Sequence, residues 1–243
     1  MATVLLFGCG PAKGGTEDGG AADDRPTAVS TANSSVEPDK QALTFTYDRH
    51  SADDYIDQQL FIKNDNGNSV VPVLAFTALD RHRHPLPGVK VRTVYGSDSG
   101  RLVVPYGWSS DILRFSGPGE HQVYDVRVTV AHLATAKVRA GIREVPTQTL
   151  NAAGLAVSKF SRFAAVRLVN TDAFPVAVRV AYLVYDQPSG GDPQQAISVT
   201  PVGGLVRIPA GGTAIVKVTG DATRAVARYS DGPAVSVKAY NSQ

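Results

Sequence analysis

The side chains that could carry out chemistry in this sequence are few and widely spaced. His82 and His84 flank Arg83, and in a strand this spacing would place both imidazoles on one face, as the start of a metal site. The sequence nearby has no cysteine or acidic cluster, and the neighbouring arginines repel a cation. We therefore expect a solvated polar loop here, with no metal and no other cofactor.

Aspartates gather at two places that could suggest calcium binding. Asp53, Asp54 and Asp57 form one group, and Asp-Asn-Gly-Asn at residues 65–68 forms the other. A calcium loop needs oxygen ligands at alternating positions, a central glycine and a glutamate at its twelfth position. The second group has only a fragment of that pattern and lacks the glutamate. Capping of helices or turns explains both groups.

Catalysis by a nucleophile is not expected either. It needs a serine or cysteine beside a base and an orienting group, and the sequence has no G-x-S-x-G motif. The only cysteine, Cys9, lies outside any expected domain, and His50, His121 and His132 are scattered along the chain. The sequence therefore predicts no catalytic residues and a protein that is not an enzyme.

The residues that stand out for binding are Tyr106 and Trp108, which lie on either side of Gly107 in an expected turn. Trp108 is the only tryptophan of the chain. An exposed aromatic pair at a loop tip is a common device for stacking on a sugar or anchoring a protein partner. The alternative interpretation is that Trp108 packs in the seam between two domains.

Composition indicates an all-β protein. Valine and alanine dominate the apolar residues, and 23 glycines and 15 prolines are typical of strands joined by turns. The net charge of +2 and the lack of a basic run argue against a nucleic-acid partner. A single cysteine excludes an internal disulfide, so the fold must rely on packing.

The amino terminus resembles a bacterial lipoprotein signal. Leu6-Phe7-Gly8-Cys9 is similar to a lipobox, in which a small residue precedes the cysteine that becomes lipidated. We expect residues 1–9 to be a truncated signal that ends at the lipid-attachment residue Cys9. Residues 10–40 are poor in large apolar side chains and are expected to form a disordered tether. By resemblance to Gram-negative lipoproteins, Gly10 permits export to the outer membrane.

From residue 41 the pattern changes to short strands separated by turn residues. In one of them Val126, Val128 and Val130 alternate with polar residues, as in a half-buried antiparallel strand. Many such strands in succession are typical of an immunoglobulin-like sandwich. We expect two tandem immunoglobulin-like antiparallel β-sandwiches, at residues 41–145 and 146–243.

Several individual strands are predicted within these domains. One is expected at residues 101–104, and the strand at residues 176–184 is apolar on both faces and should be covered on both sides. The uncertain stretch 134–156 could hold a strand at 137–144, followed by a linker. Residues 157–163 are then expected to open the second domain, and strands at 225–229 and 234–239 to close it.

Turn residues recur at a nearly constant offset, which predicts an internal duplication. Asn64 and Asn170 are 106 positions apart, and Pro105 and Pro209 are 104 apart. Glycine, proline, asparagine and aspartate mark turns in any protein, but here they recur in the same order within matched strands. Small deletions in loops would account for the shrinking offset.

The second domain contains a pattern with a family resemblance. V-N-x-x-x-x-P-V-x-V at residues 169–178, Val-Thr-Pro at 199–201, and Ile-Pro-Ala-Gly-Gly-Thr-Ala-Ile-Val-Lys-Val at 208–218 resemble the PapD-like branch of immunoglobulin folds. That branch includes the amino-terminal domains of pilus chaperones and related structural modules. The resemblance implies a fold only, because the basic pair with which pilus chaperones clamp a subunit carboxylate cannot be placed in this sequence.

These features together predict a non-enzymatic lipoprotein of the bacterial cell envelope, anchored by lipid at the outer membrane or cell surface. We expect it to act as a structural or protein-interaction module whose partners are other envelope proteins of a cell-surface or periplasmic assembly. The alternative is a carbohydrate-binding module that uses Tyr106 and Trp108. Fold alone does not decide between them.

Overall fold

The computed structural model describes residues 37–50, 56–232 and 234–243 of the 243-residue chain. The described residues belong to one compact unit, residues 36–243, which is the subject of everything below. Cys9, Asp53 and Asp54 lie outside the described residues. Lipidation at Cys9 and the role of the two aspartates therefore stay predictions.

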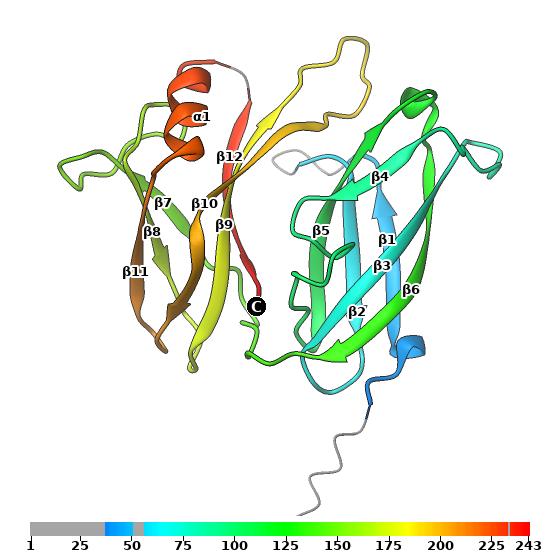
Figure 1. The fold of residues 1–243 in the computed structure, drawn as a ribbon, viewed down its shortest axis with the longest axis horizontal. Helices are drawn as coiled ribbons and strands as arrows, with labels where there is room; N and C mark the ends of the chain where they lie inside the picture. The colour runs from blue at the N-terminus through cyan, green and yellow to red at the C-terminus, as the bar shows by residue number, and fades with distance from the viewer. Residues whose placement is uncertain (1–36, 51–55, 233) are drawn as a thin grey trace, which may run out of the picture. The chain divides into compact units, whose positions relative to one another are not determined.

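The first half of the unit forms a β-sandwich with a four-stranded sheet, in the order β1–β2–β5–β4, and a two-stranded sheet, β3–β6 (Figure 1). All neighbouring strands are antiparallel. The elements are β1 (Leu43–Asp48), β2 (Gln59–Asn64), β3 (Val70–Leu79), β4 (Lys90–Thr93), β5 (Gly107–Ser116) and β6 (Asp125–Thr135), with 3-10 turns at Lys40–Ala42 and Glu120–Gln122. The second strand thus pairs with the fifth in one sheet and the third with the sixth in the other, as in immunoglobulin sandwiches.

The second half repeats this arrangement with sheets β11–β8–β7 and β10–β9–β12, again antiparallel. Its elements are β7 (Thr147–Leu150), β8 (Ala165–Val169), β9 (Val176–Tyr185), β10 (Ala196–Ile208), β11 (Thr213–Lys217), α1 (Asp221–Tyr229) and β12 (Val235–Asn241). Strands β3 and β9 are both ten residues long and start 106 positions apart. The predicted all-β fold with two tandem sandwiches is confirmed.

Strand β9 is buried on both faces because it serves two cores. Val178, Val180 and Tyr182 lie in the core of the second sandwich, whereas Leu183 and Tyr185 on the opposite face belong to the core of the first. The two sandwiches therefore share apolar packing in which β9 takes part on both faces. The prediction that residues 176–184 are covered on both sides is confirmed.

The segment at residues 101–104 joins the two sandwiches and does not form the predicted regular strand. Val104 makes an isolated antiparallel bridge with Val70 of β3, and Leu102 makes another with Ser242. The Val103 N–H also donates to the carbonyl of Asn241 at 3.0 Å. Its peptide groups are thus divided between two partner strands, and no continuous ladder with either one can form.

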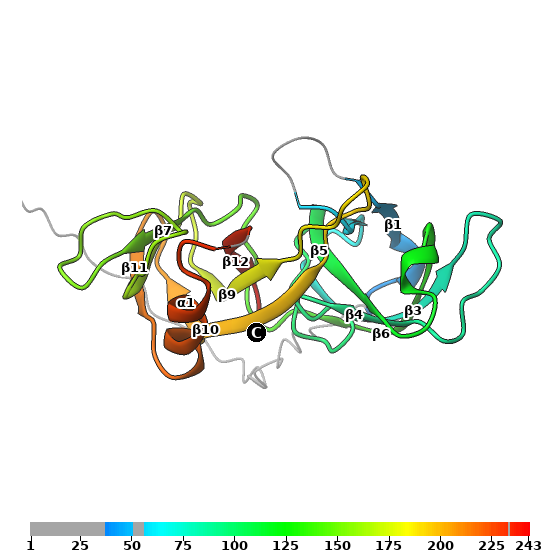
Figure 2. The same cartoon turned by 90° about the horizontal axis from the view of Figure 1, so that it is seen from above.

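The strand predicted at residues 225–229 was wrong, because this segment lies in helix α1. Ala222 and Val226, four positions apart, are the buried residues of the helix and join the second core beside β10 (Figure 2). This spacing places both side chains on one face of a helix, so the short apolar alternation at 225–229 was misleading. Within the described residues, no helix has the length and apolar character needed to cross a membrane.

The strand expected at residues 137–144 is also absent from the structure, and β7 opens the second sandwich in place of residues 157–163. In the connection between β6 and β7, the N–H of Gly141 donates to Oδ1 of Asn241 and that of Ile142 to Oδ2 of Asp172, at 3.0 and 3.1 Å. Side chains of the second sandwich thus satisfy backbone groups that a strand would have paired. The connection is held in place without belonging to a sheet.

Candidate binding site

Tyr106 and Trp108, the pair predicted for binding, both reach solvent. Their side chains are 60% and 61% exposed. Tyr106 directly precedes β5, whereas Trp108 lies within β5, opposite Lys63 of β2. The expectation of a turn at Trp108 was therefore wrong, although an outward-facing position on a strand exposes the ring as a turn would.

Each aromatic residue borders a hollow in the surface. The first hollow, of about 500 Å³, is lined by Tyr106 together with Phe174 and the connection after β6. The second, of about 250 Å³, is lined by Trp108 together with residues of the connection and of β12. Pro105 and Ile142 line both hollows, and Ile142 is 71% exposed. We call the surface formed by Tyr106, Trp108 and Ile142 the aromatic surface, after its two aromatic residues.

The fold places Ile142 in this surface through the backbone of the connection. The hydrogen bonds of Gly141 and Ile142 to Asn241 and Asp172 attach the connection to the second sandwich. A Cβ atom at Gly141 would lie 2.6 Å from Oδ2 of Asp172, so this close approach requires glycine. Ile142 is therefore anchored at its backbone while its side chain stays in solvent.

The floor of the second hollow includes an aromatic contact between the sandwiches. The rings of Tyr95 and Tyr240 stack with centroids 4.7 Å apart, and both residues line this hollow. Burial raises the pKa of Tyr95 and of Tyr240, because the ionised form of each side chain would lose its solvation. Trp108 thus lies at the edge of the seam between the sandwiches while most of its side chain faces solvent.

Cationic side chains surround the aromatic surface. Lys137 and Arg139 line the first hollow, which has no carboxylate in its lining, and Arg143 lines the second together with Glu144. Among the ion pairs of the described chain, none includes Lys137, Arg139 or Arg143. The guanidinium of Arg139 lies 3.7 Å from the centre of the Phe174 ring, a cation–π contact.

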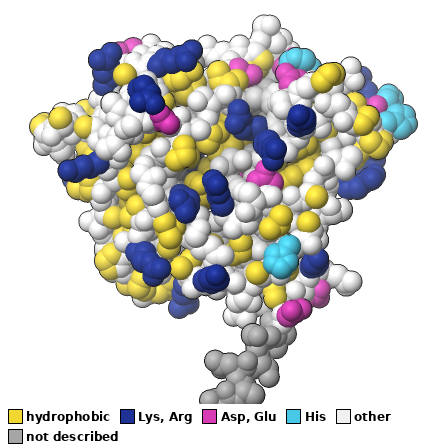
Figure 3. Space-filling view, viewed as in Figure 1, with side chains coloured by type: hydrophobic (Ala, Val, Ile, Leu, Met, Phe, Trp, Pro, Cys, Tyr) yellow, Lys and Arg dark blue, Asp and Glu magenta, His cyan; other side chains and the backbone are white. Residues whose placement is uncertain are grey.

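Positive charge in general does not mark this site. Lys and Arg side chains are spread over both sandwiches on the face in Figure 3, where acidic side chains are few. Lys63, opposite Trp108, is paired with the carboxylate of Asp65 at 2.8 Å, and the hydrogen bond and charge of Asp65 raise the pKa of Lys63. The two hollows combine unpaired cations with exposed aromatic rings in their linings.

His82 and His84 lie in a polar loop, as predicted. Both side chains are exposed, and their rings are 6.1 Å apart. The N–H groups of His82 and His84 each donate to Oδ1 of Asp80 at 2.8 Å. In the described parts of the chain, no three His, Cys, Asp or Glu side chains lie close enough together to hold a metal ion.

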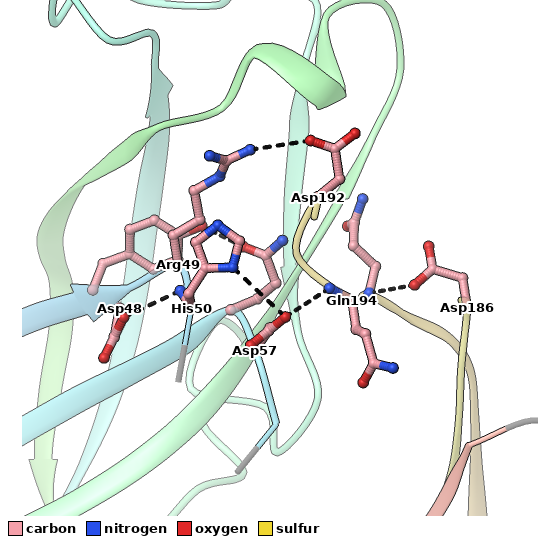
Figure 4. A network of polar contacts seen from close by, with 10 residues as sticks. Asp48, Arg49, His50, Asp57, Asp186, Asp192 and Gln194 are labelled. Atoms are coloured by element: carbon pink, nitrogen blue, oxygen red, sulfur yellow. Dashed lines mark hydrogen bonds and ion pairs between the residues drawn. The ribbon is translucent and has the colours of Figure 1, made fainter. Parts of the chain in front are cut away.

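Asp57, from the first aspartate group, belongs to a polar network that links the sandwiches (Figure 4). Its Oδ2 accepts the N–H of Gln194 at 2.9 Å and lies 4.0 Å from Nδ1 of His50. Beside it, the guanidinium of Arg49 lies 3.7 Å from the carboxylate of Asp192. These contacts attach the loop between β9 and β10 to the first sandwich, which gives Asp57 a structural role.

Sequence reasoning missed Arg139, Ile142 and Phe174 as members of the site. The pattern at residues 136–140 alternates between apolar and basic residues, and this alternation was interpreted as part of a strand. The signal available in the sequence was this alternation, which here occurs in a stretch that pairs with no strand. Phe174, in the turn before β9, gave no signal of its own.

Comparisons with protein-family models, with curated proteins and with solved structures found no significant match to this chain. The site must therefore be interpreted from its own geometry.

Proposed function

We propose that this chain is a non-enzymatic lipoprotein of the bacterial cell envelope, anchored through Cys9, and a structural or protein-interaction module of a cell-surface or periplasmic assembly. The observation that supports this proposal is the aromatic surface, in which Tyr106, Trp108 and Ile142 each expose 60% or more of the side chain. Burying one such side chain is worth about 1.5–3 kcal/mol. A partner that covers all three would gain a large part of its affinity there.

The rigidity of the unit also supports a binding role. The two sandwiches share the packing around Leu183 and the backbone contacts of residues 101–104. The N–H of Phe115 donates to Oε1 of Gln195 at 2.8 Å and adds a third link. A surface built on such a scaffold loses little conformational entropy when a partner binds.

A photo-crosslinking amino acid at position 106 tests the protein-interaction role. In cells that express the full chain, it should yield an adduct with one envelope protein, and Trp108→Ala should abolish that adduct. The matched control carries the crosslinker in place of Ile215, which is 60% exposed on β11 of the second sandwich. Adducts of equal yield from both positions, or none from position 106, would contradict the proposal.

The anchor is tested separately by cell fractionation and intact mass. The wild-type chain should partition with membranes and carry an acyl adduct on Cys9, and Cys9→Ser should release it. An unmodified chain that is free of membranes would contradict the lipid anchor and leave the location open. It would leave the aromatic surface as the only basis for a function.

A second candidate function is glycan binding, because both aromatic residues border hollows. Ligand sites usually have volumes of about 300–1,000 Å³, and the first hollow, at about 500 Å³, falls in this range. Trp108 is the only tryptophan, so its fluorescence reports directly on a ligand that stacks at the second hollow. A saturable change on titration with oligosaccharides supports this function, and its absence across a broad panel removes it.

A further inference from the structure

We propose that the two hollows beside the aromatic surface bind an acidic saccharide, with Arg139 and Lys137 holding its anionic group and Tyr106 and Trp108 contacting its sugar rings. The proposal deepens the second candidate function, glycan binding, and rests on it. It names the class of ligand, a sugar that carries a carboxylate, sulfate or phosphate.

The first argument is the charge of the hollows. Of the charged side chains that line them, Lys137, Arg139 and Arg143 are cationic and Glu144 is the one anion. All four side chains are exposed. The three cations are free of ion pairs to described residues. A neutral ligand would leave these charges unused, whereas an anionic group would form charge-assisted hydrogen bonds with them.

The second argument is the placement of Arg139. The guanidinium of Arg139 lies over the Phe174 ring, 3.7 Å from its centre. A guanidinium carries its N–H donors in one plane, from which a carboxylate or phosphate can accept two of them. Because the contact with Phe174 restricts the side chain, binding an anion should cost less entropy than at an arginine without such a contact.

The third argument is the combination of aromatic and polar groups. Tyr106 and Trp108 each expose an aromatic ring, on which the apolar face of a pyranose ring can stack. Short polar side chains that can bond to sugar hydroxyls also line the hollows, namely Asn68, Ser69, Thr135, Ser109 and Ser110. Aromatic faces, small polar groups and unpaired cations beside the two hollows together match the chemistry of an acidic sugar.

The test is a titration of the full chain, followed by Trp108 fluorescence and by calorimetry. The panel contains oligogalacturonate, oligomers of mannuronate and guluronate, a sialylated oligosaccharide and a phosphorylated one. Fully methyl-esterified oligogalacturonate is the matched neutral ligand, because it keeps the same sugar rings without the charge. We expect at least one acidic member to bind, about tenfold or more tightly than its neutral counterpart, as expected for one charge-assisted hydrogen bond.

Variants test whether the proposed cationic residue binds the anionic group of the ligand. Arg139→Gln should weaken the binding of the acidic ligand about tenfold and leave that of the neutral ester unchanged, and Arg139→Lys should restore part of the loss. Lys217→Gln removes an exposed cation of β11 that lines neither hollow, and it should have no effect. Unchanged affinity of Arg139→Gln for the acidic ligand would overturn the proposal.

The remaining outcomes separate this proposal from the function on which it rests. Equal affinity for the acid and its ester, lost in Trp108→Ala, overturns the anionic class but retains glycan binding. Failure of every saccharide to bind, or binding that Trp108→Ala leaves intact, overturns both. Hexaglutamate is included as an acidic peptide, and its binding in place of the saccharides overturns the proposal in favour of an acidic protein partner.

Discussion

Asn170 makes in the second sandwich the hydrogen bonds that Asn64 makes in the first. The Nδ2 group of Asn64 donates to the carbonyls of Asn68, Val104 and Pro105 at 2.8, 3.3 and 3.0 Å. Asn64 is fully buried and lies at the end of β2. One side chain thus joins the start of the next strand to the segment before β5.

The bonds of Asn170 follow the same order. Its Nδ2 group donates to the carbonyls of Phe174, Ile208 and Pro209 at 2.9, 3.4 and 2.9 Å. Its Oδ1 accepts the N–H of the residue two positions later at 3.0 Å, as that of Asn64 also does. The sequence repeat therefore corresponds to one structural device used twice.

Replacing either asparagine with alanine should destabilise the fold. Asn64→Ala and Asn170→Ala each remove the side-chain hydrogen bonds of a buried asparagine, and we expect each to lower the free energy of unfolding by about 2–3 kcal/mol. The two losses should be similar because the bonds are the same. Urea denaturation measures them. Asn68→Ala, at an exposed position, should change stability by less than about 0.5 kcal/mol; a loss at Asn170 no larger than this would show that the shared bonds do not stabilise the fold.

Leu183→Ala should uncouple the two sandwiches. Leu183 is fully buried and packs in the core of the first sandwich although it belongs to β9 of the second. Its truncation should cost about 2–5 kcal/mol and divide one unfolding transition into two, because the shared core makes unfolding cooperative. Calorimetry tests this against Leu168→Ala, which truncates a leucine buried in the second core. That control should lose comparable stability but keep a single transition, and a single transition in both variants would argue against coupling through Leu183.

The contribution of Asp80 to stability should depend on pH. The hydrogen bonds donated by the N–H groups of His84 and His82 hold the pKa of Asp80 below its ordinary value. The folded state therefore binds fewer protons than the unfolded state near that pKa, and the contribution is present above the ordinary pKa and lost as the pH falls through the lowered one. Asp80→Asn should lower stability at about pH 6 and have a smaller effect at about pH 2.5. Carbon-13 NMR titration gives the carboxyl midpoint directly, and a midpoint at or above the ordinary value would refute the prediction.

Gly203→Ala should destabilise the second sandwich more than Gly204→Ala. Gly203 has φ +70°, and a Cβ atom there would lie 2.6 Å from Cγ1 of Val216. Both glycines lie in the irregular part of β10 between Val202 and Val206, where the register with β9 shifts. A left-handed conformation together with a steric clash should cost about 1–3 kcal/mol. Gly204 has open space around its Cα, so thermal unfolding of the two variants isolates the effect, and equal melting temperatures would contradict it.

Much of the fold could be predicted because the short-range pattern of apolar and polar residues reflects which faces of a strand are buried. Alternation in β6 and the doubly apolar β9 follow from the side chains alone, since successive residues of a strand point to opposite faces. The recurrence of Asn64 and Asn170 also lies in the sequence, because a buried turn asparagine must recur wherever the same turn is built. Tyr106 and Trp108 stood out in the sequence as aromatic residues of an expected turn, and both are exposed to solvent.

Other features depended on which distant segments meet. Helix α1 replaced a predicted strand because Ala222 and Val226 find an apolar surface on the second core. The connection after β6 carries a strand-like alternation, but Asn241 and Asp172 hold its backbone, so it pairs with no sheet. Local preference is worth a few tenths of a kilocalorie per residue, and tertiary packing overrides it.

The sequence alone determined two β-sandwiches and their repeat, and it singled out the aromatic pair Tyr106 and Trp108. Only the tertiary structure decided that Trp108 lies in a strand and that Arg139 stacks on Phe174, 35 positions later in the chain. It also decided that Ile142 lies between the two hollows. The physical reason is that burial patterns are local properties of a strand, whereas a binding surface is made where separate segments come together, and their spacing in the sequence carries no record of that contact.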